Sequence, residues 1–172
     1  RLGAGMINDI RSLAKPGALN AAANSGLAVC MMHMQGQPRT MQSNPHYNDL
    51  FNDINEFFAE RLATCEQAGI QPERIILDPG FGFGKTLAHN YEILNKFYVF
   101  NQFKLPVLAG LSRKSMIGNL LNRDTHERLA GSLAGALIAA QNGAKIIRVH
   151  DVQETVDVLN VWQACTKGIT NE

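Results

Sequence analysis

The stretch Ile75-Ile76-Leu77-Asp78-Pro79-Gly80-Phe81-Gly82-Phe83-Gly84-Lys85 decides the fold, because an apolar run ends in a carboxylate and passes directly into a glycine-rich turn. Further short runs of Val, Ile, Leu and Met occur on both sides of it, so that the near-continuously apolar segments are 5–10, 28–34, 74–78, 106–111 and 145–149. Such runs are typical of strands in a parallel sheet that is covered on both faces.

Helical patterns separate these apolar runs, at residues 18–24, 47–68, 89–100, 127–142 and 154–166. Helix starts are indicated by Asn44 before a proline and by Asp124 with Glu127 three residues later, and helix ends by the glycines at 26, 69 and 143. The alternation predicts an α/β fold with parallel strands. Five βα units fit either a small doubly wound sheet or part of a (β/α)8 barrel, which typically needs about 250 residues.

The composition restricts the class of protein. The chain has 172 residues, 45% of them hydrophobic and 18% charged, with a net charge of +1. This predicts one compact domain over residues 1–172, with no charge pattern for nucleic acid or anionic membrane and no membrane span or signal peptide. Three widely spaced cysteines without a CxxC motif indicate reduced thiols and a cytoplasmic location. The beginning at Arg1, as if inside an element, suggests a fragment of a longer protein.

Polar side chains lie at the end of nearly every predicted strand: Asn8 and Asp9, His33, Asp78, Ser112 to Lys114, and Arg148, His150 and Asp151. Ligands of parallel α/β folds bind at the carboxyl ends of the strands, so we expect one shared site there. Arg148 and His150 alternate along a strand and share a face, which suits an anion. His33 points away from Met32 and Met34, and we interpret it as a structural histidine.

The glycine-rich turn matches neither a phosphate loop, which would need Gly at Pro79, nor the GxGxxG dinucleotide motif. We expect its glycines to let the backbone approach a flat ligand, with Phe81 or Phe83 presenting an apolar face. Asp78 would accept hydrogen bonds from the donor pair of a heterocycle. The small residues Gly131 and Gly135 predict tight helix packing.

Five motifs together, Met6–Ile10, Met32–Gly36, Asp78–Lys85, Leu111–Ser115 and Ile147–Asp151, closely resemble the bacterial dihydropteroate synthase family. The resemblance covers essentially the whole chain but corresponds to the carboxyl-terminal part of the family's single pterin-binding (β/α)8 domain, roughly strands four to eight. It implies condensation of 6-hydroxymethyl-7,8-dihydropterin diphosphate with p-aminobenzoate, for which sulfonamides compete, to form 7,8-dihydropteroate and pyrophosphate.

The resemblance also implies a role for individual residues. Asn8 and Asp78 would bind the pterin ring, Lys114 would meet its carbonyl edge, and Met32 and Gly110 would line its slot. Phe83 and Ser112, with the stem of Lys114, would border the aminobenzoate. Arg148 and His150 would hold the pyrophosphate, and Asp78 and Lys114 would be the catalytic residues.

The family's first three strands are absent, together with the loops that complete the aminobenzoate and pyrophosphate sites. Mg²⁺ would accompany the pyrophosphate, with its protein contact in the absent part and no ligand in this chain. We therefore expect a homodimeric parent enzyme, whereas this chain alone would be catalytically silent and marginally stable.

Two other interpretations remain open. One is a pterin-dependent methyltransferase of related barrel fold, although methyl transfer releases no anion for Arg148 and His150. The other is a non-catalytic half-barrel module that pairs with another chain or with itself, with the helix around Gly131 and Gly135 as its interface.

Overall fold

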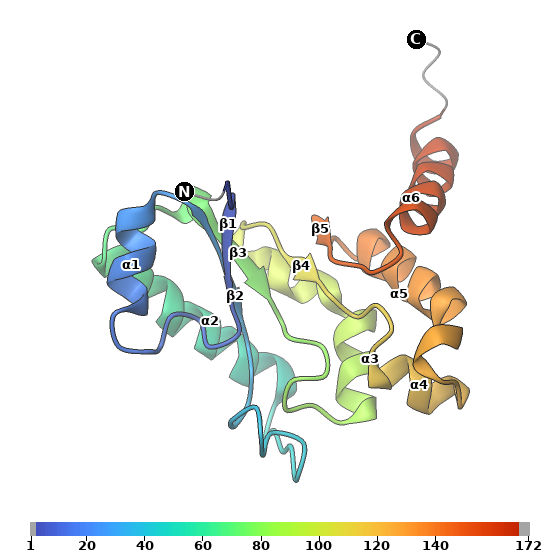
Figure 1. Ribbon diagram of the computed structural model, residues 1–172, viewed down its shortest axis with the longest axis horizontal. Helices are drawn as coiled ribbons and strands as arrows, with labels where there is room; N and C mark the ends of the chain where they lie inside the picture. The colour runs from blue at the N-terminus through green and yellow to red at the C-terminus, as the bar shows by residue number, and fades with distance from the viewer. Residues whose placement is uncertain (1–2, 169–172) are drawn as a thin grey trace.

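The computed structural model describes residues 3–168, in which strands and helices alternate along the chain (Figure 1). The elements are β1 (Met6–Asp9), α1 (Ala18–Ser25), β2 (Ala28–Met32), α2 (Leu50–Gln67), η1 (Pro72–Arg74), β3 (Ile75–Asp78), α3 (Leu87–Asn95), η2 (Phe97–Phe103), β4 (Leu108–Ala109), α4 (Ser115–Leu121), η3 (Thr125–Glu127), α5 (Leu129–Gln141), β5 (Ile146–Ile147) and α6 (Val152–Lys167). The predicted α/β class with parallel strands is confirmed. Residues 1–2 and 169–172 of the predicted domain lie outside the described part.

The strands pair in chain order and are parallel throughout the described residues. β1 pairs with β2 and β2 with β3, while β4 pairs with β5. A bridge between Leu77 and Val107 joins the two groups, and the Leu77 amide donates to the Pro106 carbonyl at 2.9 Å. All carboxyl ends therefore lie at one rim of a curved sheet, with α1 to α6 following one another around it (Figure 1).

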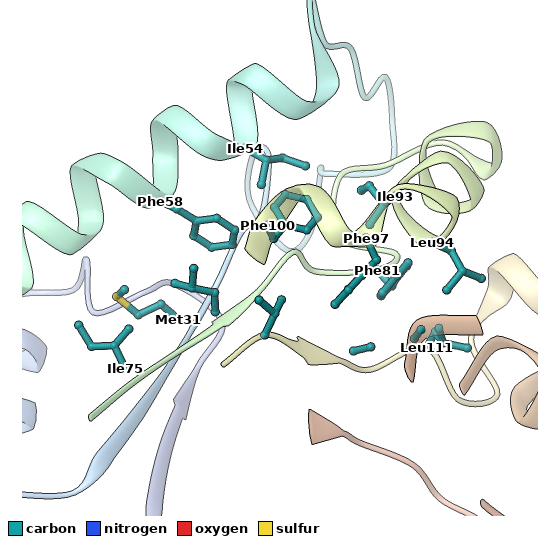
Figure 2. Close-up of a cluster of buried hydrophobic side chains, with 14 of the residues drawn as sticks. Met31, Ile54, Phe58, Ile75, Phe81, Ile93, Leu94, Phe97, Phe100 and Leu111 are labelled. Atoms are coloured by element: carbon teal, nitrogen blue, oxygen red, sulfur yellow. The ribbon is translucent and has the colours of Figure 1, made fainter. Parts of the chain in front are cut away.

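The main core fills the space between the strands and the helices that cover them. Figure 2 shows Ile54 and Phe58 of α2 beside Phe100 of η2. The rings of Phe81 and Phe97 stack with their centroids 6.1 Å apart and their planes 4° from parallel. Because these aromatic side chains are fully buried, their apolar area is a major source of stability, at roughly 25 cal/mol per Å² removed from water.

Several predicted helix boundaries were wrong. The helix expected from residue 47 begins at Leu50, because the carboxylate of Asp49 accepts from the amides of Phe51 and Asn52 at 3.1 and 3.0 Å. The helix expected over 89–100 is divided into α3 and the 3-10 segment η2. The short helix α4 was not predicted at all, since seven residues carry too little periodicity to be recognised.

Other local predictions are confirmed. Asp124 and Glu127 form a capping box, although it caps η3 and not α5 directly. The glycines at 26, 69 and 143 follow helices with positive φ. A Cβ on Gly131 would lie 2.5 Å from Ile117, and one on Gly135 would lie 2.4 Å from Leu111. These two glycines therefore allow the tight helix packing that the sequence predicts.

Within residues 3–168, no helix combines the length and apolar character that crossing a membrane requires.

Candidate functional site

The residues predicted to bind the ring lie on one face of the sheet at its carboxyl rim. Met32 is in register with Asp78, and Asn8 is in register with Cys30, two residues before Met32. Neighbours in register point to the same side of a parallel sheet, and positions two apart along a strand also share a side. Asn8, Met32 and Asp78 therefore face the same space, with Asn8 exposed and the other two buried.

Asp78 is the buried carboxylate of this face, with 1% of its surface exposed. One oxygen, Oδ1, accepts from the Gly80 amide at 2.8 Å, and Oδ2 accepts from Nη2 of Arg148 at 3.2 Å. Burial raises the pKa of Asp78, while Arg148, the Gly80 amide, Lys114 and Lys85 oppose that rise. The surrounding cations and the amide thus favour the ionised form of a carboxylate that water scarcely reaches.

Lys114 lies beside the glycine-rich loop. Its Nζ donates to the Phe81 carbonyl at 2.6 Å and lies 4.7 Å from the centroid of the Phe83 ring. Burial lowers the pKa of Lys114 to about 8, with Asp78 opposing the shift. The structure therefore brings Lys114 together with Phe83 near Asp78, which is the grouping that the sequence predicts.

The second group of predicted binding residues, Arg148 and His150, follows the end of β5. Ser112 Oγ is 3.1 Å from Nδ1 of His150 and accepts from the His150 amide at 3.2 Å. His150 is exposed, whereas Ser112 is buried. The resemblance places Ser112 at the border of the aminobenzoate, and in the structure its hydroxyl is hydrogen-bonded to His150.

The neighbouring arginine has a different partner. Arg113 forms an ion pair with Asp151, with Nε donating to Oδ2 at 2.9 Å. This pair joins the end of β4 to the start of α6 and satisfies both charges locally. Arg113 and Asp151, which the sequence placed at the rim, are therefore tied to each other.

Two glycines of the glycine-rich loop lie against the chain that follows β2. A Cβ on Gly80 would lie 2.0 Å from the His33 carbonyl oxygen, and one on Gly84 would lie 2.5 Å from that of Gln35. Gly80 and Gly84 thus allow the loop to approach the chain after β2. Phe81 is buried in the core, so Phe83 is the phenylalanine that remains near the site.

Sequence reasoning missed the contribution of Lys85 behind this loop. Its Nζ lies 3.0 Å from Nδ1 of His33 and donates to the Phe83 carbonyl at 3.1 Å. Burial lowers the pKa of His33 to about 2, so its ring is neutral, in agreement with a structural histidine. No local sequence pattern predicts this contact, because it joins residues that are 52 positions apart.

Gly110 and Arg148 lie against each other. A Cβ on Gly110 would come within 2.5 Å of Nη2 and within 3.0 Å of Cζ and Nε of Arg148. The predicted slot at Gly110 therefore adjoins the guanidinium directly.

The described residues do not fit a magnesium site of their own. Within residues 3–168, no three His, Cys, Asp or Glu side chains come together to hold a metal ion. Asp78, the buried carboxylate at the rim, is already bonded to Arg148 and Gly80.

Comparison with known proteins gives consistent similarities. The sequence profile described as "Pterin binding enzyme" matches residues 1–150. Dihydropteroate synthase of Escherichia coli strain K12 is 58% identical over 172 residues, which is all of this chain and 61% of that protein. The chain thus spans about three fifths of the length of this relative.

Solved structures are similar as well. Yersinia pestis dihydropteroate synthase, solved in complex with a sulfonamide drug, has a TM-score of 0.94 at 56% identity, covering 96% of this chain and 60% of that one. The Xanthomonas albilineans dihydropteroate synthase in complex with 7,8-dihydropteroate has a TM-score of 0.88 at 47% identity, covering 95% of this chain and 61% of that one. The predicted fold, part of a (β/α)8 barrel, is confirmed.

Proposed function

The chain belongs to the pterin-binding enzyme family, and from this premise we propose that it supplies the pterin- and anion-binding side of a dihydropteroate synthase. The observation that carries the proposal is the buried carboxylate of Asp78 between Lys114 and the Arg148–His150 end of one rim. The reaction joins 6-hydroxymethyl-7,8-dihydropterin diphosphate to p-aminobenzoate and releases pyrophosphate.

The pterin ring would lie against the face that carries Asn8, Met32 and Gly110. Asp78 would accept hydrogen bonds from its amino edge, and Lys114 would donate to its carbonyl edge. A carboxylate buried beside the ring also stabilises positive charge that develops on the pterin methylene, since fixed charges act strongly where water is excluded.

The leaving group would lie at Arg148 and His150. The bond between the methylene carbon and the diphosphate oxygen breaks, and pyrophosphate leaves with the electron pair. The amine of p-aminobenzoate, bordered by Phe83 and the stem of Lys114, forms the new carbon–nitrogen bond and releases its proton to solvent. No nucleophile from this chain is required.

Magnesium enters the proposal only as an ion coordinated by the pyrophosphate, because Mg²⁺ commonly binds through the phosphate oxygens of a substrate. Within residues 3–168, no three His, Cys, Asp or Glu side chains are grouped to hold it.

Two observations favour this proposal over methyl transfer. Arg148 and His150, supported by Ser112, offer donors to an anion, and a methyl group leaves none. The similar proteins above are named dihydropteroate synthases.

We also propose that the protein is a homodimer in the cytoplasm. Exposed valines on α6 support the dimer, and the three free cysteines support the cytoplasmic location. Light scattering would give the mass in solution and test the dimer.

Calorimetric titration with 6-hydroxymethylpterin at pH 7 tests the proposal directly. We expect saturable binding near one site per chain, weakened about 10- to 100-fold by Asp78→Asn, because hydrogen bonds to a charged group contribute about 1.5–3 kcal/mol each. Asp157→Asn, an exposed carboxylate on α6, is the matched control and should leave the affinity unchanged. Equal loss in both variants, or no binding by the folded chain, would contradict the proposal.

A further inference from the structure

The segment after β5 is held to the loop after β4 by two successive pairs of side chains. Ser112 contacts His150, and the next residue, Arg113, pairs with Asp151. Both contacts join residues 38 positions apart, which is also the offset between the paired residues of β4 and β5. The side chains therefore continue the strand register beyond the two short strands.

The backbone of Arg113 is fixed by α5. Its φ is 56°, in the left-handed region that residues other than glycine rarely adopt. Its amide donates to Oγ of Ser132 at 2.9 Å, and its carbonyl accepts from Nη1 of Arg128 at 2.9 Å. Neither hydrogen bond involves the Arg113 side chain. The backbone next to Lys114 is therefore fixed independently of the partner of that side chain.

The Arg113 side chain forms a two-pronged ion pair with Asp151. Nε donates to Oδ2 at 2.9 Å, and Nη2 donates to Oδ1. A planar guanidinium that binds a carboxylate through two donors fixes the orientation of both groups. The side chains of Arg113 and Asp151 are 29% and 12% exposed, so the pair is partly shielded from water. Asp151, and with it the peptide of His150, is thus tied to a rigid point.

His150 depends on this tie because little else fixes its backbone. β5 is two residues long and, within residues 3–168, pairs only with β4. His150 is exposed, and its amide and Nδ1 both contact the single hydroxyl of Ser112. Asp151 supplies the next fixed point, at the start of α6, where its carbonyl accepts from the Thr155 amide at 3.2 Å. Ser112 and the Arg113–Asp151 pair therefore hold His150 from two directions.

We infer that the Arg113–Asp151 ion pair positions His150 for the anion, although neither residue of the pair binds the anion itself. A carboxylate next to an anion site is unfavourable by Coulomb's law, and the paired Arg113 offsets the charge of Asp151. Residues in left-handed conformations often occur at functional sites, which agrees with this role for Arg113. The inference rests on the proposed function, since it assumes that His150 binds pyrophosphate.

Calorimetric titration of the chain with inorganic pyrophosphate, at pH 7 and constant ionic strength, tests the inference through Asp151→Asn. We expect about tenfold weaker binding, the loss that corresponds to one misaligned ionic hydrogen bond. Charge alone predicts the opposite sign, because the variant removes a negative charge beside the site and leaves Arg113 unpaired. Asp157→Asn removes a charge elsewhere on α6, and as the matched control it should leave the affinity unchanged.

Two further measurements distinguish positioning from a general loosening of the fold. The affinity of Asp151→Asn for 6-hydroxymethylpterin should stay within about twofold, because α5 still fixes the backbone beside Lys114. Added to His150→Gln, Asp151→Asn should cause no further loss of pyrophosphate affinity, because the pair acts through His150. Arg113→Lys, which keeps the charge but loses the two-pronged geometry, should show the same difference between the two ligands.

The outcomes separate the inference from the function on which it rests. Unchanged or tighter pyrophosphate binding by Asp151→Asn, equal weakening of both ligands, or an additive loss with His150→Gln would each overturn the inference. The absence of pyrophosphate binding by the folded unaltered chain would overturn it as well. The proposed function is judged separately, by the binding of 6-hydroxymethylpterin to the unaltered chain and the effect of Asp78→Asn on that binding.

Discussion

Lys85 is a buried cation that lies behind the proposed site and holds its loop in place. Only 3% of its surface is exposed, and its ammonium contacts the His33 ring and the Phe83 carbonyl. Burial lowers the pKa of Lys85 to about 7, while the charge of Asp78 opposes the shift. Lys85 therefore holds the Phe83 carbonyl through a hydrogen bond and also interacts with the charge of Asp78.

The depressed pKa of Lys85 predicts how stability changes with pH. The unfolded chain holds this proton up to the ordinary pKa of 10.5, and the folded chain releases it near pH 7. Between these values the unfolded state binds more protons, so the contribution of Lys85 to the free energy of unfolding increases as the pH rises. Below pH 7 both states are protonated, and burial of the charge opposes folding in full.

Urea denaturation of the unaltered chain and Lys85→Met at pH 7, 8 and 9 measures this effect. We expect the difference in free energy of unfolding to shift in favour of the unaltered chain by at most about 1.4 kcal/mol per pH unit. Lys114, whose pKa is also lowered, is present in both proteins and cancels. Parallel pH profiles would contradict the assignment.

At the scale of elements, the chain after β2 holds the glycine-rich loop after β3. The Tyr47 hydroxyl donates to the Gly84 carbonyl at 2.7 Å, and the Gln42 side chain donates to the Gly82 carbonyl. Gln35 in turn accepts from the His46 amide at 3.0 Å. The loop that presents Phe83 is therefore positioned by a second loop, in addition to its own strand.

The same contact predicts a difference between two glycines. Gly80 and Gly82 both have positive φ, at 73° and 78°, so alanine introduces backbone strain at either. At Gly82 the new Cβ meets only Lys114 Cδ at 3.7 Å, and we expect a loss of about 1 kcal/mol. At Gly80 it meets the His33 carbonyl at 2.0 Å, and we expect a loss of about 3 kcal/mol or more.

Urea denaturation of Gly80→Ala and Gly82→Ala at pH 7 makes this comparison, with Gly82→Ala as the matched control for strain. Equal losses would show that the approach to the chain after β2 is not what requires glycine at position 80.

At the scale of the whole molecule, the sheet has an edge at each end of the described residues. β1 pairs only with β2, and β5 only with β4. The backbone groups at these edges are unpaired, and side chains such as Val161 on α6, which is 66% exposed, are open to solvent. Both features favour association with another chain or coverage of the edges by further strands and helices. The proposed pterin face is open on the side of β1, where Asn8 is exposed.

This arrangement predicts that the 172-residue chain alone does not turn over substrate. Joining it to the amino-terminal part of the Escherichia coli relative that it does not cover should restore pyrophosphate release, because the edges are then paired. A coupled pyrophosphate assay measures both proteins, and Asp78→Asn in the joined protein serves as the inactive control. Turnover by the chain alone would contradict the prediction.

The sequence by itself determined the alternation of strands and helices, the parallel direction of the strands and the rim at which the polar residues gather. These features follow from apolar periodicity and from the residues at strand ends, which are local properties of the chain. The five motifs also identified the family correctly. Helix boundaries were less certain, because caps such as Asp49 act through a few hydrogen bonds.

Only the tertiary structure decided which of these residues are partners. Arg148 pairs with Asp78 across 70 positions, Ser112 bonds to His150 across 38, and Lys85 reaches His33 across 52. It also decided that Phe81 enters the core whereas Phe83 stays near Lys114. Such pairings depend on how the curved sheet and its loops bring distant segments together. A local sequence pattern cannot predict them, because it contains no information about which distant segments become neighbours.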